Sequence, residues 1–169
     1  FQVFAISLCL EEGQSVVVES NRQLTHGNYN HTEPAWSPDS KTIVFVANCT
    51  AKADVENNTD LWSVPAKGGP LKRLTRSKGP LRAPAYSPDG KWIAYVGHEN
   101  EFARATQDKI YVVPACGGSA TKITVDFDRT YGSRIITDMR ATESTVLPPQ
   151  WSKDGKTLYF LATDGGSSN

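Results

Sequence analysis

Apolar residues recur along the chain in short runs, each of which follows an aromatic residue and a turn. The run at 43–46 reads Ile-Val-Phe-Val and is apolar at every position. A short strand with this pattern is covered on both faces of its sheet. A buried helix is the alternative, but a run bounded by turn residues is too short for one. The pattern therefore predicts a short β-strand with no solvent-facing side.

The same aromatic–turn–strand unit is present three times. The copies are 36–47 (WSPDSKTIVFVA), 86–97 (YSPDGKWIAYVG) and 151–162 (WSKDGKTLYFLA). In the second copy Pro88 fixes φ at the first turn position, and Gly90 tolerates a positive φ. Ser40 replaces the glycine in the first copy and Lys153 replaces the proline in the third. Because the flanking runs are rich in β-branched and aromatic residues, each copy predicts a β-hairpin.

One aspartate recurs at the same place in every turn, at Asp39, Asp89 and Asp154. An aspartate there accepts a hydrogen bond from the backbone two residues further on. A residue that recurs at the same position of every repeat is expected to have a structural role in the repeat. We therefore expect these three carboxylates to be structural turn residues, and not an acid–base pair, which would have to share one cleft.

A closing tetrad completes each unit, at 22–25, 72–75 and 121–124, and Trp36 precedes Tyr86 by 50 residues. The chain then divides into four stretches: 1–25 (partial), 26–75, 76–124 and 125–169 (partial, with an insert at 125–147). Each full unit contains four short strands. We expect all of 1–169 to form one partial domain of these repeats.

Four antiparallel strands repeated about every 50 residues predict the blades of a β-propeller. The expected fold class is all-β, with about three blades and an incomplete propeller that is truncated at both ends. A β-sandwich is the alternative, but it predicts cleaner alternation and no recurring turn. Because an open stack leaves two apolar faces uncovered, we expect the chain to continue beyond the printed sequence or to pair with another copy as a homo-oligomer.

Charge and cysteine content exclude several classes of function. Eighteen Lys and Arg residues balance eighteen Asp and Glu residues. Without a basic field, neither nucleic acid nor an anionic membrane is an expected partner. The three cysteines are scattered, so no zinc motif and no disulfide framework is expected. A reducing compartment, and hence a cytoplasmic location, is the expectation.

The insert holds the least repetitive sequence and several charges. Asp126, Asp128, Arg129 and Arg134 are the candidate residues for contact with substrate or with another domain, since arginine binds carboxylates with two hydrogen bonds. A solvated connection between blades is the alternative.

Metal, cofactor and catalytic residues are not expected in this chain. His26, His31 and Glu33 lie near one another in the sequence, but their spacing matches no known metal site. No Gly-x-Ser-x-Gly pentapeptide is present, so no serine nucleophile is assigned.

The repeat resembles the propellers of two groups of proteins. The residues that carry this resemblance are 34–39 (PAWSPD), 60–65 (DLWSVP), 68–69 (GG) and 73–75 (RLT). One group is the prolyl oligopeptidase family of serine peptidases, especially the acylaminoacyl peptidase and dipeptidyl peptidase branches. The other is the TolB-type propeller. The stretches 26–34 and 125–138 resemble the acylaminoacyl peptidase-like proteins and favour the peptidases.

The peptidase resemblance implies that the full polypeptide has two domains, one catalytic and one non-catalytic. A C-terminal α/β-hydrolase domain of the same polypeptide would hold the catalytic residues and cleave short or N-acylated peptides. This chain would be the non-catalytic propeller that limits access of the peptide substrate. The TolB resemblance implies instead a protein-interaction propeller with no enzymatic activity.

Overall fold

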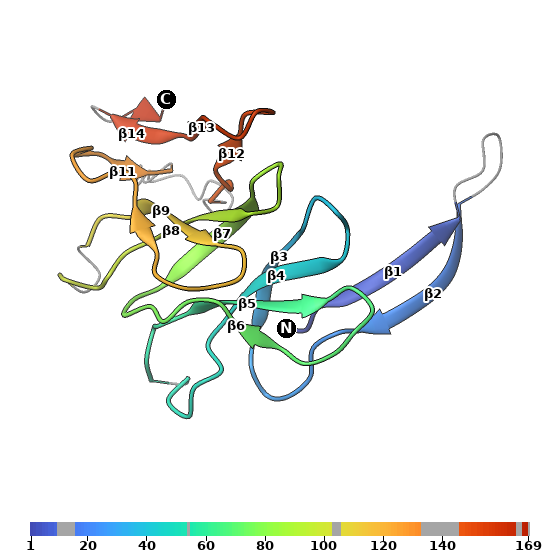
Figure 1. The fold of residues 1–169 in the computed structure, drawn as a ribbon. Coiled ribbons are helices and arrows are strands. Elements are labelled where there is room, and N and C mark those ends of the chain that lie inside the picture. The colour runs from blue at the N-terminus through green and yellow to red at the C-terminus, as the bar shows by residue number, and fades with distance from the viewer. Residues whose placement is uncertain (10–15, 54, 103–105, 133–145, 165–166, 169) are drawn as a thin grey trace.

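The computed structural model describes residues 1–9, 16–53, 55–102, 106–132, 146–164 and 167–168 (Figure 1). Across these residues the regular structure consists of β-strands, and none of it is helical. Accordingly, no helix in this part of the chain is long and apolar enough to cross a membrane.

Two sheets of four antiparallel strands form the centre of the molecule. The first contains, in spatial order, β3 (His31–Trp36), β4 (Thr42–Ala47), β5 (Asp60–Pro65) and β6 (Lys72–Arg73). The second contains β7 (Leu81–Tyr86), β8 (Trp92–Gly97), β9 (Lys109–Pro114) and β10 (Thr121–Lys122). Each sheet runs from strand to neighbouring strand in chain order. The all-β fold class with four-stranded antiparallel blades is therefore confirmed.

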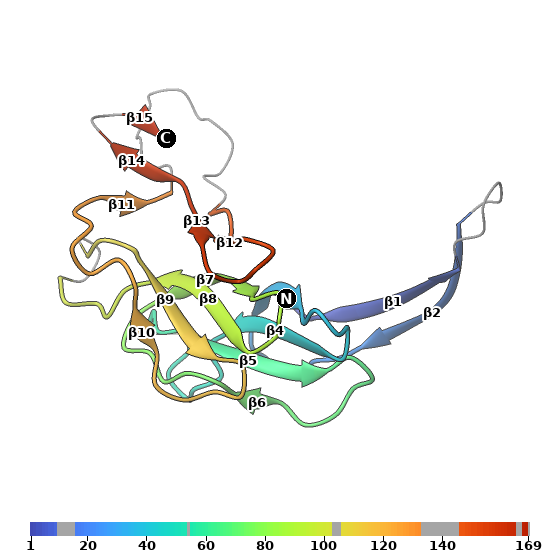
Figure 2. The ribbon, with the colours of Figure 1, turned by 45° about the horizontal axis from the view of Figure 1, so that its top comes forward.

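A two-stranded hairpin precedes the first four-stranded sheet and reaches away from the body (Figures 1 and 2). It consists of β1 (Phe4–Cys9) and β2 (Val17–Gln23). A recurring hydrogen bond shows which part of a blade it is. The backbone N–H groups of Val3, Leu61 and Ile110 donate to the hydroxyls of Thr25 (2.9 Å), Thr75 (3.0 Å) and Thr124 (3.0 Å). The hairpin thus corresponds to β5–β6 and β9–β10, the outer two strands of a blade.

The last part of the chain provides the inner two strands of a further blade. Its strands are β11 (Thr130–Tyr131), β12 (Gln150–Trp151), β13 (Leu158–Tyr159), β14 (Ala162–Asp164) and β15 (Ser167–Ser168). Trp151 lies opposite Leu158, as Trp36 lies opposite Ile43 in the first full blade. Tyr131 lies opposite Ala162. The matching pair in the first full blade is His31 and Ala47.

It follows from this register that β11 and β12 are the two ends of one inner strand. The chain between them is therefore an addition inside that strand. In the two full blades the same position holds a β-bulge, between Thr32 and Ala35 and between Arg82 and Ala85. The bulged residues Glu33 and Ala83 both adopt positive φ values, 52° and 53°.

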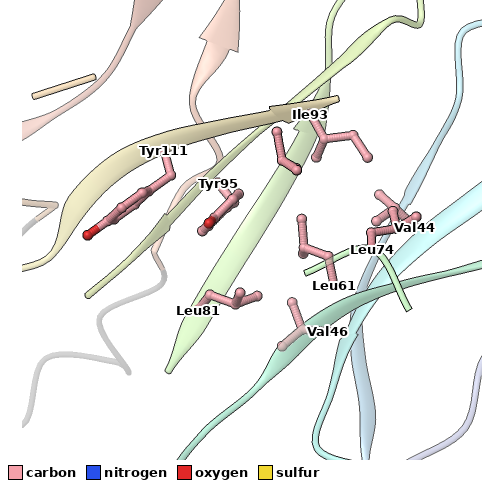
Figure 3. Close-up of a cluster of buried hydrophobic side chains, with 9 residues drawn as sticks. Val44, Val46, Leu61, Leu74, Leu81, Ile93, Tyr95 and Tyr111 are labelled. Atoms are coloured by element: carbon pink, nitrogen blue, oxygen red, sulfur yellow. The ribbon is translucent and has the colours of Figure 1, made fainter. Parts of the chain in front are cut away.

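The core lies between the sheets, because the second strand of each of the two full blades is covered on both faces. Val44 and Val46 face the second sheet, where they join Ile93 and Tyr95 in one cluster (Figure 3). Phe45 faces the opposite side, in a cluster with Val3 of the hairpin region. All four residues of 43–46 are at most 4% exposed, which confirms the prediction of a strand with no solvent-facing side.

Replacing Phe45 by alanine tests this packing. The side chain is fully buried, so Phe45→Ala should lower the free energy of unfolding by about 3–5 kcal/mol. Urea denaturation followed by tryptophan fluorescence measures the change. Val55→Ala is the matched control, since Val55 is 82% exposed and its loss should change stability by less than about 0.5 kcal/mol. Equal effects of the two variants would contradict the two-sided burial.

Candidate functional site

The recurring aspartates form one and the same hydrogen-bonded turn in three places. Asp39 accepts from the hydroxyl of Ser37 at 2.7 Å and from the backbone N–H of Lys41 at 3.1 Å. Asp89 and Asp154 repeat both bonds, at 2.6 and 3.1 Å. The serine bond, followed by the backbone bond, lowers the pKa of each carboxyl below its ordinary value. These carboxylates hold turns on the surface.

The lowered pKa values give the turns a defined pH dependence. A carboxyl group whose folded pKa is depressed adds stability above its unfolded pKa of about 3.9, and this stability is lost as the pH falls through the folded value. The triple variant Asp39→Asn/Asp89→Asn/Asp154→Asn keeps an acceptor but cannot titrate. Its urea midpoint should therefore fall less steeply than that of the wild type below about pH 4. Parallel curves would contradict the role of the charge.

Asp60 is the buried carboxylate that joins the outer strand and the linker to the first full blade. It is 4% exposed. Arg73 donates to it at 2.5 Å, the Thr75 hydroxyl at 2.9 Å and the backbone N–H of Ser77 at 2.8 Å. Three donors therefore converge on one acceptor group, and this arrangement fixes where the chain leaves the blade.

Removing this acceptor should destabilise the protein. In Asp60→Ala the buried donors lose their partner, so the free energy of unfolding should fall by about 1–3 kcal/mol. Thermal and urea denaturation measure the loss. Glu56→Ala provides the comparison, because the Lys52–Glu56 ion pair is exposed and contributes less than about 1 kcal/mol. A loss for Asp60→Ala no larger than that for Glu56→Ala would show that the network is dispensable.

The charged residues proposed for substrate or domain contact lie in the linker that leads into β11. Asp126, Asp128 and Arg129 are exposed. Gln107 donates to the Asp128 carboxylate at 3.4 Å, and Arg129 donates to the backbone oxygen of Asp128 at 2.8 Å. Arg134 lies outside the described residues. A binding role for the four residues stays a prediction.

The structure separates the side chains that are close in sequence around 26–33. His31 is buried, its Nδ1 lies 3.3 Å from the backbone oxygen of Phe1, and its ring contacts Phe45 edge-on at 5.3 Å. Burial lowers its pKa. The Glu33 carboxylate instead accepts from the backbone N–H of Ala83 in the next blade. Within the described ranges, no three His, Cys, Asp or Glu side chains are grouped as metal ligands.

A polar hollow that sequence reasoning missed lies between the two full blades. Its volume is about 570 Å³. Arg73, Arg76, Tyr95, Glu99 and Cys116 are among the residues that line it. These residues come from strands β6 and β8 and from linkers and turns of the two blades, so no spacing in the sequence marks them. The arginine and glutamate charges and the Tyr95 hydroxyl in this lining suit the binding of a polar group.

A second, apolar hollow of about 560 Å³ lies on the outer face of the second full blade. It lies between the second sheet and the β12–β13 hairpin, and its lining includes Ile110, Ile123, Trp151, Leu158 and Phe160. At the preceding blade interface the corresponding space is filled by side chains of the next sheet. The hollow is therefore present because, within the described residues, the third blade covers this face of the second sheet with its inner strands alone.

The chain is similar to known peptidases in sequence and to TolB-type propellers in structure. No protein-family model matches the chain. It is 32% identical over 153 residues to the uncharacterized peptidase YuxL of Bacillus subtilis, and covers 22% of that protein. It is 26% identical over 138 residues to dipeptidyl-peptidase 5 of Porphyromonas gingivalis, and covers 18% of it. These matches span 82% and 80% of the chain.

Among solved structures, a putative TolB from Agrobacterium tumefaciens is similar with a TM-score of 0.61 and 22% identity. The match covers 86% of this chain and 47% of the TolB chain. The chain thus spans about a fifth of the curated peptidases and nearly half of the TolB structure. The resemblance seen in the repeats is confirmed: the chain has the TolB-like β-propeller fold and is similar in sequence to peptidases.

Proposed function

We propose that this chain is the propeller part of a serine peptidase of the prolyl oligopeptidase family. The observation that carries the proposal is the 32% identity to a peptidase over 153 residues, which is most of the chain. The second peptidase match covers nearly the same share of the chain. In this proposal the catalytic serine, acid and base belong to an α/β-hydrolase domain of the same polypeptide.

The proposed role of the chain itself is to limit which substrates reach that domain. Its recurring carboxylates and the buried Asp60 support the blades: the aspartates at 39, 89 and 154 hold turns, and Asp60 holds an outer strand. A ring of such blades in front of an active site excludes large folded proteins and admits short peptides. The whole enzyme would therefore cleave short or N-acylated peptides, in the cytoplasm.

The experiment is to label the full-length product of the gene that encodes this chain with a fluorophosphonate probe. The expected result is covalent labelling of one serine, which is lost when the serine of a Gly-x-Ser-x-Gly sequence is changed to alanine. Hydrolysis of a dipeptide or N-acylated peptide amide should be lost in the same variant. A full-length product that neither reacts nor hydrolyses such substrates would overturn the proposal.

Gating makes a separate prediction about substrate size. The intact enzyme should cleave a short peptide but leave the same sequence uncleaved within a folded protein. Opening the seam between the two full blades, by Glu33→Ala to remove the contact with Ala83, should relax this limit while the rate on the short peptide stays the same. Unchanged size selection in this variant would count against a gating role for that seam.

A TolB-like interaction propeller is the second candidate function. It is favoured by the structural match, in which the chain covers 47% of the TolB chain. Under this function the full-length product would bind a protein ligand and would show no labelling by the serine-directed probe. The same labelling experiment therefore separates the two candidates.

A further inference from the structure

The polar hollow between the two full blades is formed by two complete four-stranded sheets. Every residue that lines it lies between Arg73 and Ala120, in these sheets or in their connections. Its volume of about 570 Å³ is within the usual range of small-molecule sites, about 300–1,000 Å³. The hollow is therefore a property of the seam between two whole blades.

Tyr95 brings a hydroxyl to this hollow at a position where the other two copies of the repeat have phenylalanine. When the copies are aligned by their turns, Tyr95 corresponds to Phe45 and Phe160. Phe45 is fully buried. Tyr95 is also buried, at 6% exposure, and its ring belongs to the apolar cluster of the seam (Figure 3). Packing at this position thus needs the ring alone, and the hydroxyl is an addition.

The hydroxyl of Tyr95 opens into the hollow without a protein partner. Within the described residues it makes no hydrogen bond, yet it is not one of the fully enclosed unpaired atoms, such as Trp62 Nε1, so it borders the space of the hollow. Stacking on Tyr111, with ring centres 5.4 Å and planes 9° apart, fixes the direction of its ring. A polar group that leaves water without a partner costs free energy. A bound acceptor would remove this cost.

The protonation of this hydroxyl suits a donor. Burial, followed by the neighbouring Tyr111 and Glu99, raises the pKa of Tyr95. The phenol therefore keeps its proton at neutral pH and can donate it in a hydrogen bond to an anionic oxygen.

Two opposite charges line the same hollow and are not paired. Arg76 lies in the linker that follows β6, and Glu99 lies in the loop that follows β8. Both are exposed. Within the described part of the chain neither forms an ion pair, with the other or with a third group. Arg73, by contrast, is bound by Asp60. One unpaired cation and one unpaired anion in a single hollow suit a ligand that carries both charges.

We propose that this hollow binds a short peptide with free termini, with its α-carboxylate at Arg76 and Tyr95 and its α-ammonium at Glu99. Arginine holds a carboxylate with two hydrogen bonds, and the Tyr95 hydroxyl donates a further one. The ligand belongs to the chemical class that the proposed enzyme would release. The site is nevertheless built from residues of this chain alone and does not rest on the peptidase proposal.

Protection of Cys116 from alkylation tests the proposal at the site itself. Cys116 is exposed and lines the hollow, so iodoacetamide should modify it in the full-length product. The dipeptide Ala-Ala, at ten times its dissociation constant, leaves about a tenth of the sites empty. The rate of Cys116 modification should then fall about tenfold. Peptide mapping by mass spectrometry restricts the measurement to Cys116, so binding of Ala-Ala in another domain does not contribute.

Tyr95→Phe separates ligand binding from packing. The ring remains, as at Phe45 and Phe160, so the urea midpoint should be unchanged or higher. Protection of Cys116 should require at least about tenfold more Ala-Ala, because the carboxylate loses a donor.

Capped peptides test which charge each residue binds. The C-terminal amide of Ala-Ala should bind the wild type about tenfold more weakly than Ala-Ala, and Arg76→Gln should remove this difference. Glu99→Gln should remove the corresponding difference for N-acetyl-Ala-Ala. Lys78→Gln is the matched control, since Lys78 is exposed in the same linker but does not line the hollow. It should keep both differences.

The proposal is overturned if Ala-Ala leaves the modification rate unchanged, if protection is as strong in Tyr95→Phe, or if the capped peptides protect Cys116 as well as Ala-Ala does. A Cys116 that iodoacetamide cannot reach in the full-length product would mean that another part of the polypeptide fills the hollow, and this too would overturn it. None of these results affects the fluorophosphonate labelling that tests the peptidase function.

Discussion

The packing of each sheet against its neighbours is the constraint on which the rest of this structure depends. The second strand of a blade sends alternate side chains into two different clusters, so that Phe45 and Val46 are both buried although they point in opposite directions. A single four-stranded sheet cannot bury both of its faces by itself. Stability is therefore shared between adjacent blades, as in other repeat proteins whose units contact mainly their neighbours.

Polar contacts then set the spacing of the blades that the apolar contacts hold together. The hydroxyl of Thr59 both donates to the backbone oxygen and accepts from the backbone N–H of Leu81 in the next blade. The Glu33 carboxylate makes a further bond across the same seam, to Ala83. At the following seam the backbone N–H of Tyr131 donates to the backbone oxygen of Asp108 at 3.5 Å, and the Trp151 indole donates to the backbone oxygen of Ala85. The side chains that cross the two seams differ, whereas the turns repeat the same residues within each blade.

The blades could be predicted from the sequence because the repeat depends on interactions between residues that are close together in the chain. The turn around Asp89 and the apolar run of 43–46 both act within one hairpin, where spacing along the chain decides the outcome. The polar hollow at Arg76 and Glu99 could not be predicted, since its lining comes from two blades and follows no period. The burial of His31 could not be predicted either. Its polar neighbours in the sequence indicate a loop, but its ring contacts Phe45 in the core.

The interrupted inner strand of the third blade shows where a propeller can lengthen without losing its architecture. A bulge already breaks the ladder at Glu33 and Ala83, so the pairs on either side do not depend on the residues between them. In the third blade β11 and β12 keep their partners although many residues separate them. The bulge is thus a natural entry point for new sequence, and a peptide grafted there in either full blade would be displayed from an intact scaffold.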